Sequence, residues 1–431
     1  MAATGKVLML VENLPVPVDT RVWAEATTLR DRGFQVSIIC PKGASRYRES
    51  YICIDGIHIY RYQLPQATNN FTTYLAEYSV AMFKTFWLSL VVLLRHGFDV
   101  IHAANPPDLF FIIGLFYRLL GKKFVFDQHD LAAELFQAKF KGRAKLLHRL
   151  LLFLERCSYQ RADLVIVTNE SQRRIAIERG RCPGDRVFVV RNGPDLERLQ
   201  LVTPEPELKK GRRFLLAYVG VMAAQDGVEY TLHALHDLVY KRGRQDVSLV
   251  LMGNGDLIPA LKALAHTLQL DEYVNFTGWV TSADLVRYLT VADVGLAPDP
   301  QNGLNEYSTT IKTMEYMAMG KPIVAFELVE TRFSAQQAAL YATPNLVEDF
   351  ANKIEALLDN EELRLTMGVI GRKRIEEELS WDHTKKRLLL AYETLLPTGS
   401  ELSEPLVSAS VADQIKTRTG QVKKSSQSST N

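Results

Sequence analysis

Residues 302–326 read NGLNEYSTTIKTMEYMAMGKPIVAF, and the rest of the chain can be interpreted from this stretch. A polar loop precedes a helical pattern over about residues 309–319, which Gly320 ends and Pro322 follows before a short apolar strand. Three residues can cap this helix: Ser308, Thr309 and Thr310. A capped helix start leaves backbone N–H groups at the positive end of the helix dipole, where they attract an anion. The stretch therefore predicts a phosphate-binding turn.

Lys312 and Glu315 are three residues apart, so they share one face of this helix near its start. A cation there can bind a phosphate. A carboxylate one turn further on can accept hydrogen bonds from paired sugar hydroxyls. The alternative is a solvent-exposed ion pair on an amphipathic helix. The helix alone leaves both interpretations open.

The same stretch resembles the signature of the family 4 retaining glycosyltransferases, Glu-Ala-Met-Ala-x-Gly-x-Pro-Val-Val. Here the motif reads Glu315-Tyr-Met-Ala-Met-Gly320-Lys-Pro322-Ile-Val. The resemblance implies a GT-B fold, with two Rossmann-like domains that face a cleft. It also implies that Glu315 binds the ribose hydroxyls of a nucleotide-sugar donor. Weaker motifs extend the likeness, in order, over about residues 5–396.

Short apolar segments recur along the first half of the chain, with helical patterns between them. They lie at residues 6–11, 35–40, 100–103, 124–126, 164–168 and 187–190. Near-continuous apolar strands of this kind are typical of a parallel sheet covered on both faces, so we predict a doubly wound α/β domain. Ligands of such domains bind at the carboxyl ends of the strands. Our candidates for the acceptor side are Asp19, Arg21, Asp130, Glu134 and Asn192, the last of which lies in the turn that closes this half.

His129 is the candidate catalytic residue of the first half. It follows the strand at residues 124–126, between the carboxylates of Asp127 and Asp130. A single histidine is more often structural, but its place at the carboxyl end of a strand favours a chemical role. In the resembling family a histidine in this loop reaches the donor sugar. The local sequence Phe-Asp-Gln-His-Asp-Leu is similar to a branch of bacterial surface-polysaccharide and fucosaminyl-type transferases.

The α/β pattern begins again after a charged linker at about residues 205–213. Apolar strands at residues 214–219, 248–252 and 274–276 alternate with helical patterns, and Gly220, Gly253 and Gly255 lie in strand-to-helix loops that would bind the donor. We predict four regions. They are an acceptor-binding domain over residues 1–204, a nucleotide-sugar-binding domain over 205–380, a helix over 381–397 that crosses back to the first domain, and a disordered tail over 398–431.

Two positions depart from the family pattern. The arginine and lysine that hold the donor pyrophosphate in the family are replaced by Val221 and Asp226, and the first acid of the Glu-x7-Glu pair is displaced by one position to Glu306. We expect Lys312 to supply the missing charge, because an anion site without a cation is strongly unfavourable. Lost activity is the alternative. Asp226 could orient a donor hydroxyl or hold a metal, but no Asp-x-Asp motif accompanies it, and we predict no metal site.

Composition sets few limits on function. The 431 residues are 47% hydrophobic and 23% charged, as in an ordinary globular protein of two or three domains. Residues 1–200 carry 27 Lys and Arg against 19 Asp and Glu, a net charge of +8, and the remainder carries −6. The basic half could face anionic lipid or a phosphate-bearing substrate. The four cysteines lack metal-ligand spacing and are predicted to be reduced and mostly buried. No signal peptide is predicted.

Two segments are suited to a membrane surface. Residues 71–94 form an apolar helical pattern, and residues 139–161 form another whose first turns are rich in lysine and arginine. Covering the sheet is the alternative for both apolar faces. The longest apolar run, residues 79–94, falls short of the roughly 20 residues that span a bilayer, so no spanning helix is predicted.

The resemblance and these residues together predict a retaining glycosyltransferase of cell-surface polysaccharide synthesis. It would move a hexose, or an amino or deoxy hexose, from a nucleotide diphosphate sugar to a carbohydrate or lipid-linked glycan. Lys312 would stabilise the departing pyrophosphate, His129 would position the sugar, and Glu306 would hold a donor hydroxyl. No cofactor beyond the donor is expected to be required, although Mg²⁺ is not excluded, and no nucleic acid partner is expected. The expected location is cytoplasmic, including the inner face of the membrane. The alternatives are a sugar-nucleotide epimerase or isomerase of the same fold, and a non-catalytic partner protein.

Overall fold

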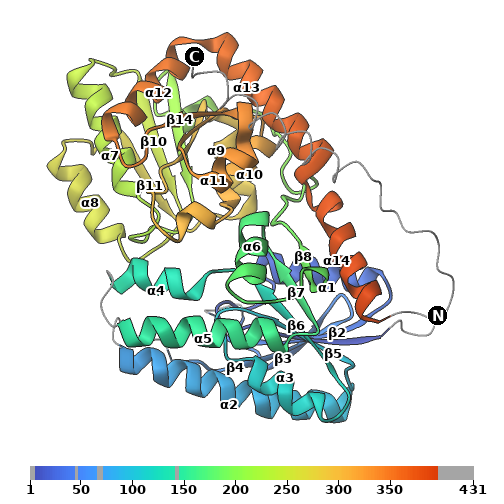
Figure 1. The fold of residues 1–431 in the computed structure, drawn as a ribbon. Coiled ribbons are helices and arrows are strands. Elements are labelled where there is room, and N and C mark those ends of the chain that lie inside the picture. The colour runs from blue at the N-terminus through green and yellow to red at the C-terminus, as the bar shows by residue number, and fades with distance from the viewer. Residues whose placement is uncertain (1–4, 44–46, 66–70, 141–144, 397–431) are drawn as a thin grey trace, which may run out of the picture. The chain divides into compact units, whose positions relative to one another are not determined.

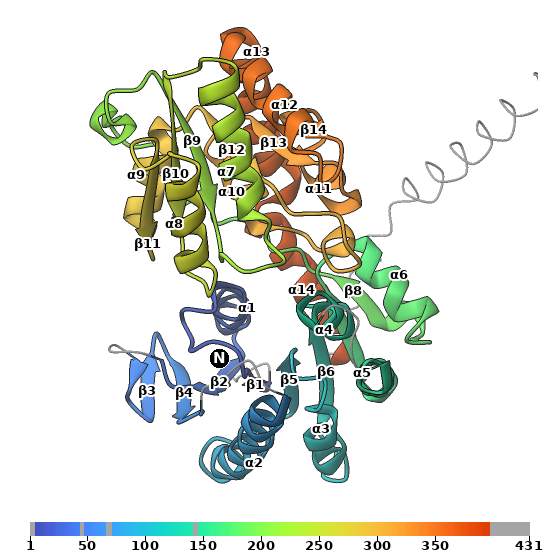
Figure 2. The same ribbon diagram turned by 90° about the vertical axis from the view of Figure 1, so that its left-hand side faces the viewer.

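The computed structural model describes residues 5–43, 47–65, 71–140 and 145–396 (Figure 1). Met1–Leu396 forms one compact unit. It contains two separate sheets, each with helices on both faces (Figures 1 and 2). The predicted fold class of two Rossmann-like α/β domains is therefore confirmed. The boundary between residues 204 and 205 stays a prediction, and the predicted tail lies outside the described residues.

The first sheet has eight strands in the order β3-β4-β2-β1-β5-β6-β7-β8, and all neighbours are parallel except β3 and β4. The strands are β1 (Lys6–Leu10), β2 (Gln35–Pro41), β3 (Tyr51–Ile54), β4 (Ile57–Tyr62), β5 (Val100–Ala104), β6 (Lys123–Gln128), β7 (Leu164–Val167) and β8 (Val187–Val189). The sequence located six of them but missed the β3-β4 hairpin. Its signal is the turn at Asp55-Gly56, where both residues have positive φ.

Helices bury apolar stripes on both faces of this sheet. α1 (Thr20–Asp31) and α14 (Trp381–Leu395) share one core with it, and α2 (Phe71–Arg95), α3 (Phe111–Arg118) and α5 (Lys145–Arg161) cover the other face. The indole of Trp381 donates to the Thr28 hydroxyl at 3.0 Å, so the last helix packs on the first domain. The remaining helices of this half are α4 (Ala132–Phe140) and α6 (Glu170–Glu178).

The second sheet has six parallel strands in the order β11-β10-β9-β12-β13-β14. They are β9 (Phe214–Val219), β10 (Val247–Met252), β11 (Val274–Gly278), β12 (Val294–Ala297), β13 (Ile323–Phe326) and β14 (Ala339–Ala342). One face is covered by α7 (Val228–His236), α8 (Ile258–Thr267) and α12 (Val347–Asp359), and the other by α9 (Ser282–Val291) and α10 (Ile311–Ala318). The other helices are α11 (Val329–Ala335) and α13 (Glu361–Arg374).

Of the two segments suited to a membrane surface, the second differs from its predicted form. The pattern at residues 139–161 belongs to two helices, because α4 ends at Phe140 and α5 begins at Lys145; the basic residues Lys141 and Arg143 lie outside the described residues. α2 matches the helix predicted over residues 71–94 to within one residue. Its segment Ala76–Arg95 has 20 residues and is long and apolar enough to cross a membrane, by length and composition alone. The expectation that this run is too short was therefore wrong, although core helices of soluble proteins satisfy the same criteria.

The four cysteines are free. Cys40 and Cys182 are buried, Cys157 is half-buried and Cys53 is exposed. The prediction of mostly buried thiols therefore holds for half of them. Cys53 is exposed because it lies on β3, the edge strand that the sequence did not reveal.

Candidate functional site

The predicted phosphate-binding turn is α10 with the loop in front of it. Thr310 is the N-cap residue of α10, but its side chain makes no capping hydrogen bond. It bonds the Thr313 hydroxyl at 2.8 Å, while the Ser308 hydroxyl donates to the Leu304 carbonyl at 2.9 Å. Among the described residues, no side chain therefore caps the N–H groups of the first turn, and these groups can bind an anion.

Lys312 is buried in the first turn of α10. Its ammonium donates to Oδ1 of Asp299 at 2.6 Å, and its Cε lies 3.4 Å from where a Cβ on Gly220 would be. Burial by itself lowers the pKa of Lys312, but the Asp299 and Asp226 carboxylates raise it above its usual value. The lysine therefore carries a buried positive charge, and its ion-pair partner is Asp299. The alternative of a solvent-exposed pair with Glu315 is wrong.

The predicted donor glycines lie where two strand-to-helix loops of the second sheet touch. A Cβ on Gly253 would lie 1.9 Å from the Gly220 carbonyl oxygen, and one on Gly255 would lie 2.3 Å from the Met222 carbonyl oxygen. The two backbones approach too closely for any side chain at either position. Gly220, Gly253 and Lys312 thus meet at the carboxyl ends of β9 and β10, where open α/β sheets bind ligands.

Asp226 lies in the loop between β9 and α7, and its carboxylate interacts electrostatically with the Lys312 ammonium. Its carboxylate accepts a hydrogen bond from the Ala223 N–H at 3.2 Å. Burial raises the pKa of Asp226 to about 6, against the lowering effect of Lys312. With Asp226 ionised, the Lys312, Asp299 and Asp226 group carries one net negative charge, which protonation of Asp226 removes.

Glu315 is buried one turn after Lys312 and contacts a different cation. Nη2 of Arg198 donates to its Oε1 at 2.9 Å. Burial raises the pKa of Glu315, and Arg198 opposes this rise. The carboxylate that the resemblance assigns to the donor ribose is thus held in place by a guanidinium from the segment ahead of β9.

The loop in front of α10 is tied to α6. Asn169, the N-cap of α6, donates through Nδ2 to the Thr309 hydroxyl at 3.0 Å and to the Tyr307 carbonyl at 2.9 Å. Glu306 lies beside Tyr307 on the turn η5 (Asn305–Tyr307), and Gln301 donates to its carboxylate at 3.3 Å. The loop in front of α10 is therefore anchored on the first half of the chain through Asn169.

His129 directly follows β6, as predicted. Its Nε2 lies 2.6 Å from Oδ2 of the buried Asp127, which also receives hydrogen bonds from Arg21 at 2.8 and 3.3 Å. Burial by itself lowers the pKa of His129, but Asp127 raises it above its usual value. Burial by itself raises the pKa of Asp127, whereas Arg21 and His129 hold it well below its usual range. Asp127 thus fixes the ring of His129 and favours its protonated form.

Three of the acceptor-side candidates have structural partners. Asp19 caps α1 by accepting from the Val22 N–H at 3.1 Å. Arg21 is buried, and besides binding Asp127 it donates to the Asn192 side chain at 2.6 Å. Through these contacts Arg21 and Asn192 belong to the hydrogen-bonded network that holds Asp127, the partner of His129. A direct role for them in acceptor binding stays a prediction.

The two remaining acceptor-side candidates lie near the start of α4. The Asp130 N–H donates to the Asn105 side chain at 3.1 Å. Glu134 forms an ion pair with Arg179, which also binds the buried Glu155 at 2.7 Å. Glu134 lies 3.9 Å from the position of a Cβ on Gly303, in the loop in front of α10. Glu134 therefore lies beside the loop in front of α10.

A cluster of possible metal ligands lies behind His129. Among the described residues, Glu25, His102 and Asp127 form this cluster. Each offers one possible ligand atom, and the three atoms lie within 4.8 Å of one another. Nη2 of Arg21 is 3.1 Å from Glu25 and 2.8 Å from Asp127. The guanidinium already contacts both carboxylates, so the cluster is a buried ion-pair network that supports His129.

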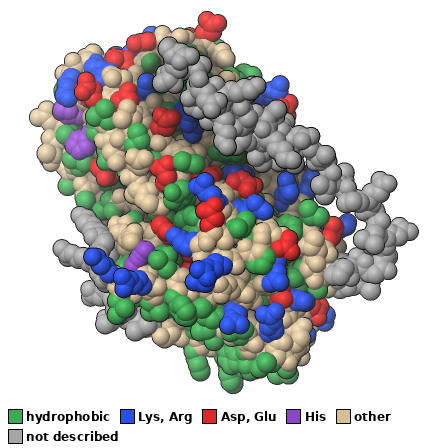
Figure 3. Space-filling view, viewed as in Figure 1, with side chains coloured by type: hydrophobic (Ala, Val, Ile, Leu, Met, Phe, Trp, Pro, Cys, Tyr) green, Lys and Arg blue, Asp and Glu red, His purple; other side chains and the backbone are tan. Residues whose placement is uncertain are grey.

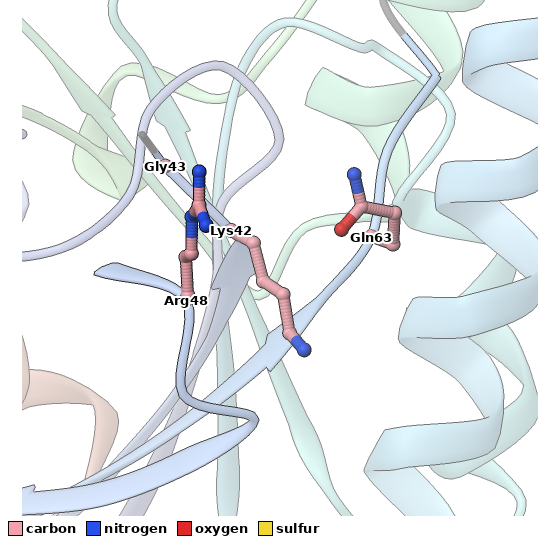
Figure 4. Close-up of a pocket in the computed structure, with 4 residues that line it drawn as sticks. All are labelled: Lys42, Gly43, Arg48 and Gln63. Atoms are coloured by element: carbon pink, nitrogen blue, oxygen red, sulfur yellow. The ribbon is translucent and has the colours of Figure 1, made fainter. Parts of the chain in front are cut away.

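A pocket of about 430 Å³ opens at the carboxyl ends of β2 and β4 (Figure 4). It is lined by Lys42, Gly43, Arg48 and Gln63, and the Gln63 amide faces the two cations across it. Lys42 and Arg48 make no ion pair with the described residues, so the pocket suits an anionic group. Since β2 and β6 are three strands apart, the pocket lies about 14 Å along the sheet edge from His129.

Two family models match most of the chain. The model described as Glycosyltransferase Family 4 matches residues 18–198, and the model described as Glycosyl transferases group 1 matches residues 213–360. The protein is a glycosyltransferase of the family 4 type. Its more specific placement in the surface-polysaccharide or fucosaminyl-type branch stays a prediction.

This glycosyltransferase is similar to other glycosyltransferases over most of its length. It is 21% identical over 373 residues to an uncharacterised glycosyltransferase of Methanocaldococcus jannaschii, over 85% of this chain and 91% of the relative. It is 26% identical over 321 residues to the MMP α-(1→4)-mannosyltransferase of Mycolicibacterium hassiacum, over 72% of this chain and 74% of the relative.

Solved structures share its GT-B fold. Sucrose-phosphate synthase of Thermosynechococcus elongatus has a TM-score of 0.74 at 17% identity, covering 90% of this chain and 99% of the other. HepE of Anabaena, solved in complex with UDP-glucose, has a TM-score of 0.67 at 15% identity, covering 90% and 100%. At these identities the likeness concerns the fold.

Three charged residues of the glycosyltransferase site were not assigned from the sequence. Asp127 is the second-last residue of β6, and Asp299 closely follows β12. A carboxylate at the carboxyl end of a buried strand is the signal that could have found both. Arg198 carries no comparable signal, because it lies in an irregular segment and reaches Glu315 only through folding.

Proposed function

We propose that this glycosyltransferase moves a hexose, or an amino or deoxy hexose, from a nucleotide diphosphate sugar to a carbohydrate or lipid-linked glycan, with retention of configuration. The observation that carries the proposal is the meeting of Lys312, Gly220 and the uncapped first turn of α10. The mannosyltransferase among the relatives and the UDP-glucose complex among the fold neighbours support this donor class.

The pyrophosphate leaving group would explain why Lys312 and the start of α10 lie together. As the bond between the sugar carbon and the pyrophosphate oxygen breaks, negative charge grows on the pyrophosphate. The Lys312 ammonium and the N–H groups at the start of α10 would stabilise that charge. Because the Lys312 ammonium is hydrogen-bonded to Asp299, bound donor would compete with Asp299 for the ammonium.

The remaining side chains would orient the two ends of the donor. Glu315, held by Arg198, would accept hydrogen bonds from the ribose, and Glu306 would hold a hydroxyl of the sugar. His129, held by Asp127, would position the sugar near the reacting carbon. In this proposal no metal is required to bind the donor, and the thermal-shift panel with and without Mg²⁺ tests this.

The proposed biological setting is synthesis of a cell-surface polysaccharide, at the cytoplasmic side of a membrane. Its basis is the resemblance around His129 and the basic first half of the chain. The basic pocket at Lys42 and Arg48 fits an acceptor that carries a negative charge away from its reacting hydroxyl.

A thermal-shift panel tests the donor. UDP, GDP, ADP and their sugars are each added with and without Mg²⁺ to the wild type and to Glu315→Ala. A ligand at a hundred times its dissociation constant adds about 2.7 kcal/mol to the stability of the folded state. Stabilisation by one nucleotide family that is lost in the variant supports the proposal, and no stabilisation by any of them overturns it. A changed sugar nucleotide formed without acceptor would favour the epimerase or isomerase.

A further inference from the structure

Three helices on one face of the first sheet expose an apolar surface. We define the apolar face by Phe83 and Trp87 on α2, Phe116 on α3 and Leu119 directly after it, and Leu150 and Phe153 on α5, all of which are exposed. Residues 83 and 87, and residues 150 and 153, are spaced at one helical turn, so each pair projects from one side of its helix. Figure 3 shows hydrophobic side chains gathered over this part of the molecule.

The three helices form one layer. The rings of Phe86 and Phe116 meet edge to face with centroids 5.0 Å apart, and the hydroxyls of Ser89 and Tyr117 bond at 2.8 Å, so α2 packs on α3. α3 in turn packs on α5. The opposite side of α2 is buried against the sheet. α2 can therefore lie on a membrane surface, whereas crossing the membrane would remove it from the core of the domain.

Cations accompany the apolar face. Lys84 and Arg95 on α2 and Lys145 and Arg149 on α5 are exposed and make no ion pair with the described residues. Within the described part of the three helices, no acidic side chain is exposed. The acid of α5, Glu155, is buried against Arg179. Apolar side chains together with unpaired cations are the features that bind anionic lipid.

We propose that the apolar face docks on the surface of an anionic lipid bilayer. The charge argues for lipid rather than a second copy of the chain, because a symmetric dimer through this face would bring its cations together. Helices of a doubly wound fold run back from the carboxyl ends of the strands, so α3 and α5 begin at the same sheet edge as His129. If the proposed function holds, a docked enzyme would present this edge to an acceptor that is anchored in the same bilayer.

Flotation with vesicles tests the docking directly. The full-length protein is mixed with vesicles of phosphatidylcholine alone, or with a third of phosphatidylglycerol, at low and high salt. Wild type is expected to float with the anionic vesicles, and less at high salt. Phe83→Ser/Trp87→Ser and Lys84→Glu/Lys145→Glu/Arg149→Glu are each expected to weaken binding about a hundredfold.

The matched control is Leu365→Ser/Val369→Ser on α13, since these residues are 65% and 68% exposed and Phe83 and Trp87 are 67% and 61% exposed. The control should float like wild type. Equal binding of all variants, or equal binding to neutral and anionic vesicles, would overturn the proposal. The proposal would also be overturned if the wild type eluted as a dimer on size-exclusion chromatography and only Phe83→Ser/Trp87→Ser eluted as a monomer. Donor-induced thermal stabilisation of the same variants tests the proposed function separately, because these residues lie away from the donor loops.

Discussion

The ammonium of Lys312 lies 2.6 Å from Oδ1 of Asp299, and both side chains are buried. The ammonium lies beside the loop between β9 and α7, where the resembling family places an arginine and a lysine and this chain has Val221 and Asp226. The chain thus has one positive charge in this place, and that charge already has a carboxylate partner. The pair explains how a buried cation is kept charged without donor, and it makes the strength of donor binding depend on both residues.

Loss of the Lys312 charge should slow the reaction. Lys312→Ala is expected to lower kcat about a hundredfold, as removal of a principal donor to a developing negative charge does elsewhere. Asp299→Asn should instead tighten donor binding, because the ammonium is freed for the pyrophosphate. Steady-state kinetics and calorimetry with nucleotide sugar measure the two effects. Lys209→Ala, which breaks the ion pair with Asp293 at 2.8 Å, is the control. Near-normal turnover in Lys312→Ala would refute the role of the lysine.

Arg198 should be needed to keep Glu315 ionised. Burial already raises the pKa of Glu315, and without Arg198 it would rise further, so that a protonated carboxyl meets the ribose. Arg198→Ala is expected to weaken donor binding about tenfold at pH 6.5 and to recover part of the affinity at pH 8.5. Calorimetry at both pH values provides the measurement. Tighter binding by the variant would mean that Arg198 competes with the donor.

His129 should act in its protonated form. Because Asp127 raises the pKa of His129 above its usual value, activity that needs the imidazolium is present at low pH and falls as the pH rises through that raised pKa. Asp127→Asn should move the fall to lower pH, and His129→Ala should abolish it. The pH dependence of kcat/KM measures this. His266→Ala, which removes an exposed histidine paired with Asp271, should leave the profile unchanged. An unshifted profile in Asp127→Asn, with its folding verified by thermal melting, would contradict the prediction.

Donor affinity should rise as the pH falls through about 6, the raised pKa of Asp226. Protonation there removes a negative charge beside the site of the pyrophosphate, and we expect an improvement of about fivefold. Asp226→Asn should bind more tightly and show no such dependence, while Asp256→Asn in the neighbouring loop should behave as wild type. Titrations should use intact nucleotide sugar, because the terminal phosphate of a free nucleotide itself titrates near pH 6. A pH-independent wild type would exclude Asp226 from the pyrophosphate site.

Local patterns in the sequence were enough for most of the fold. Continuous apolar runs located six strands of the first sheet, and Gly320 and Pro322 located the end of α10. Both signals depend on neighbours in the chain, which is why they can be read without the fold. The β3-β4 hairpin was missed because β3 is an apolar run of only four residues, YICI, and the apolar residues of β4, IHIYRY, are interrupted by His58 and Arg61.

The sequence by itself determined the two α/β domains, the position of His129 at the end of a strand, and the helix start at α10 that we predict to bind phosphate. Only the tertiary structure decided the partners of the charged residues. Lys312 and Glu315 are neighbours on one helix, yet they bind Asp299 and Arg198, which lie 13 and 117 residues away. Buried charges need partners, and the order of strands and helices determines which partners come within reach.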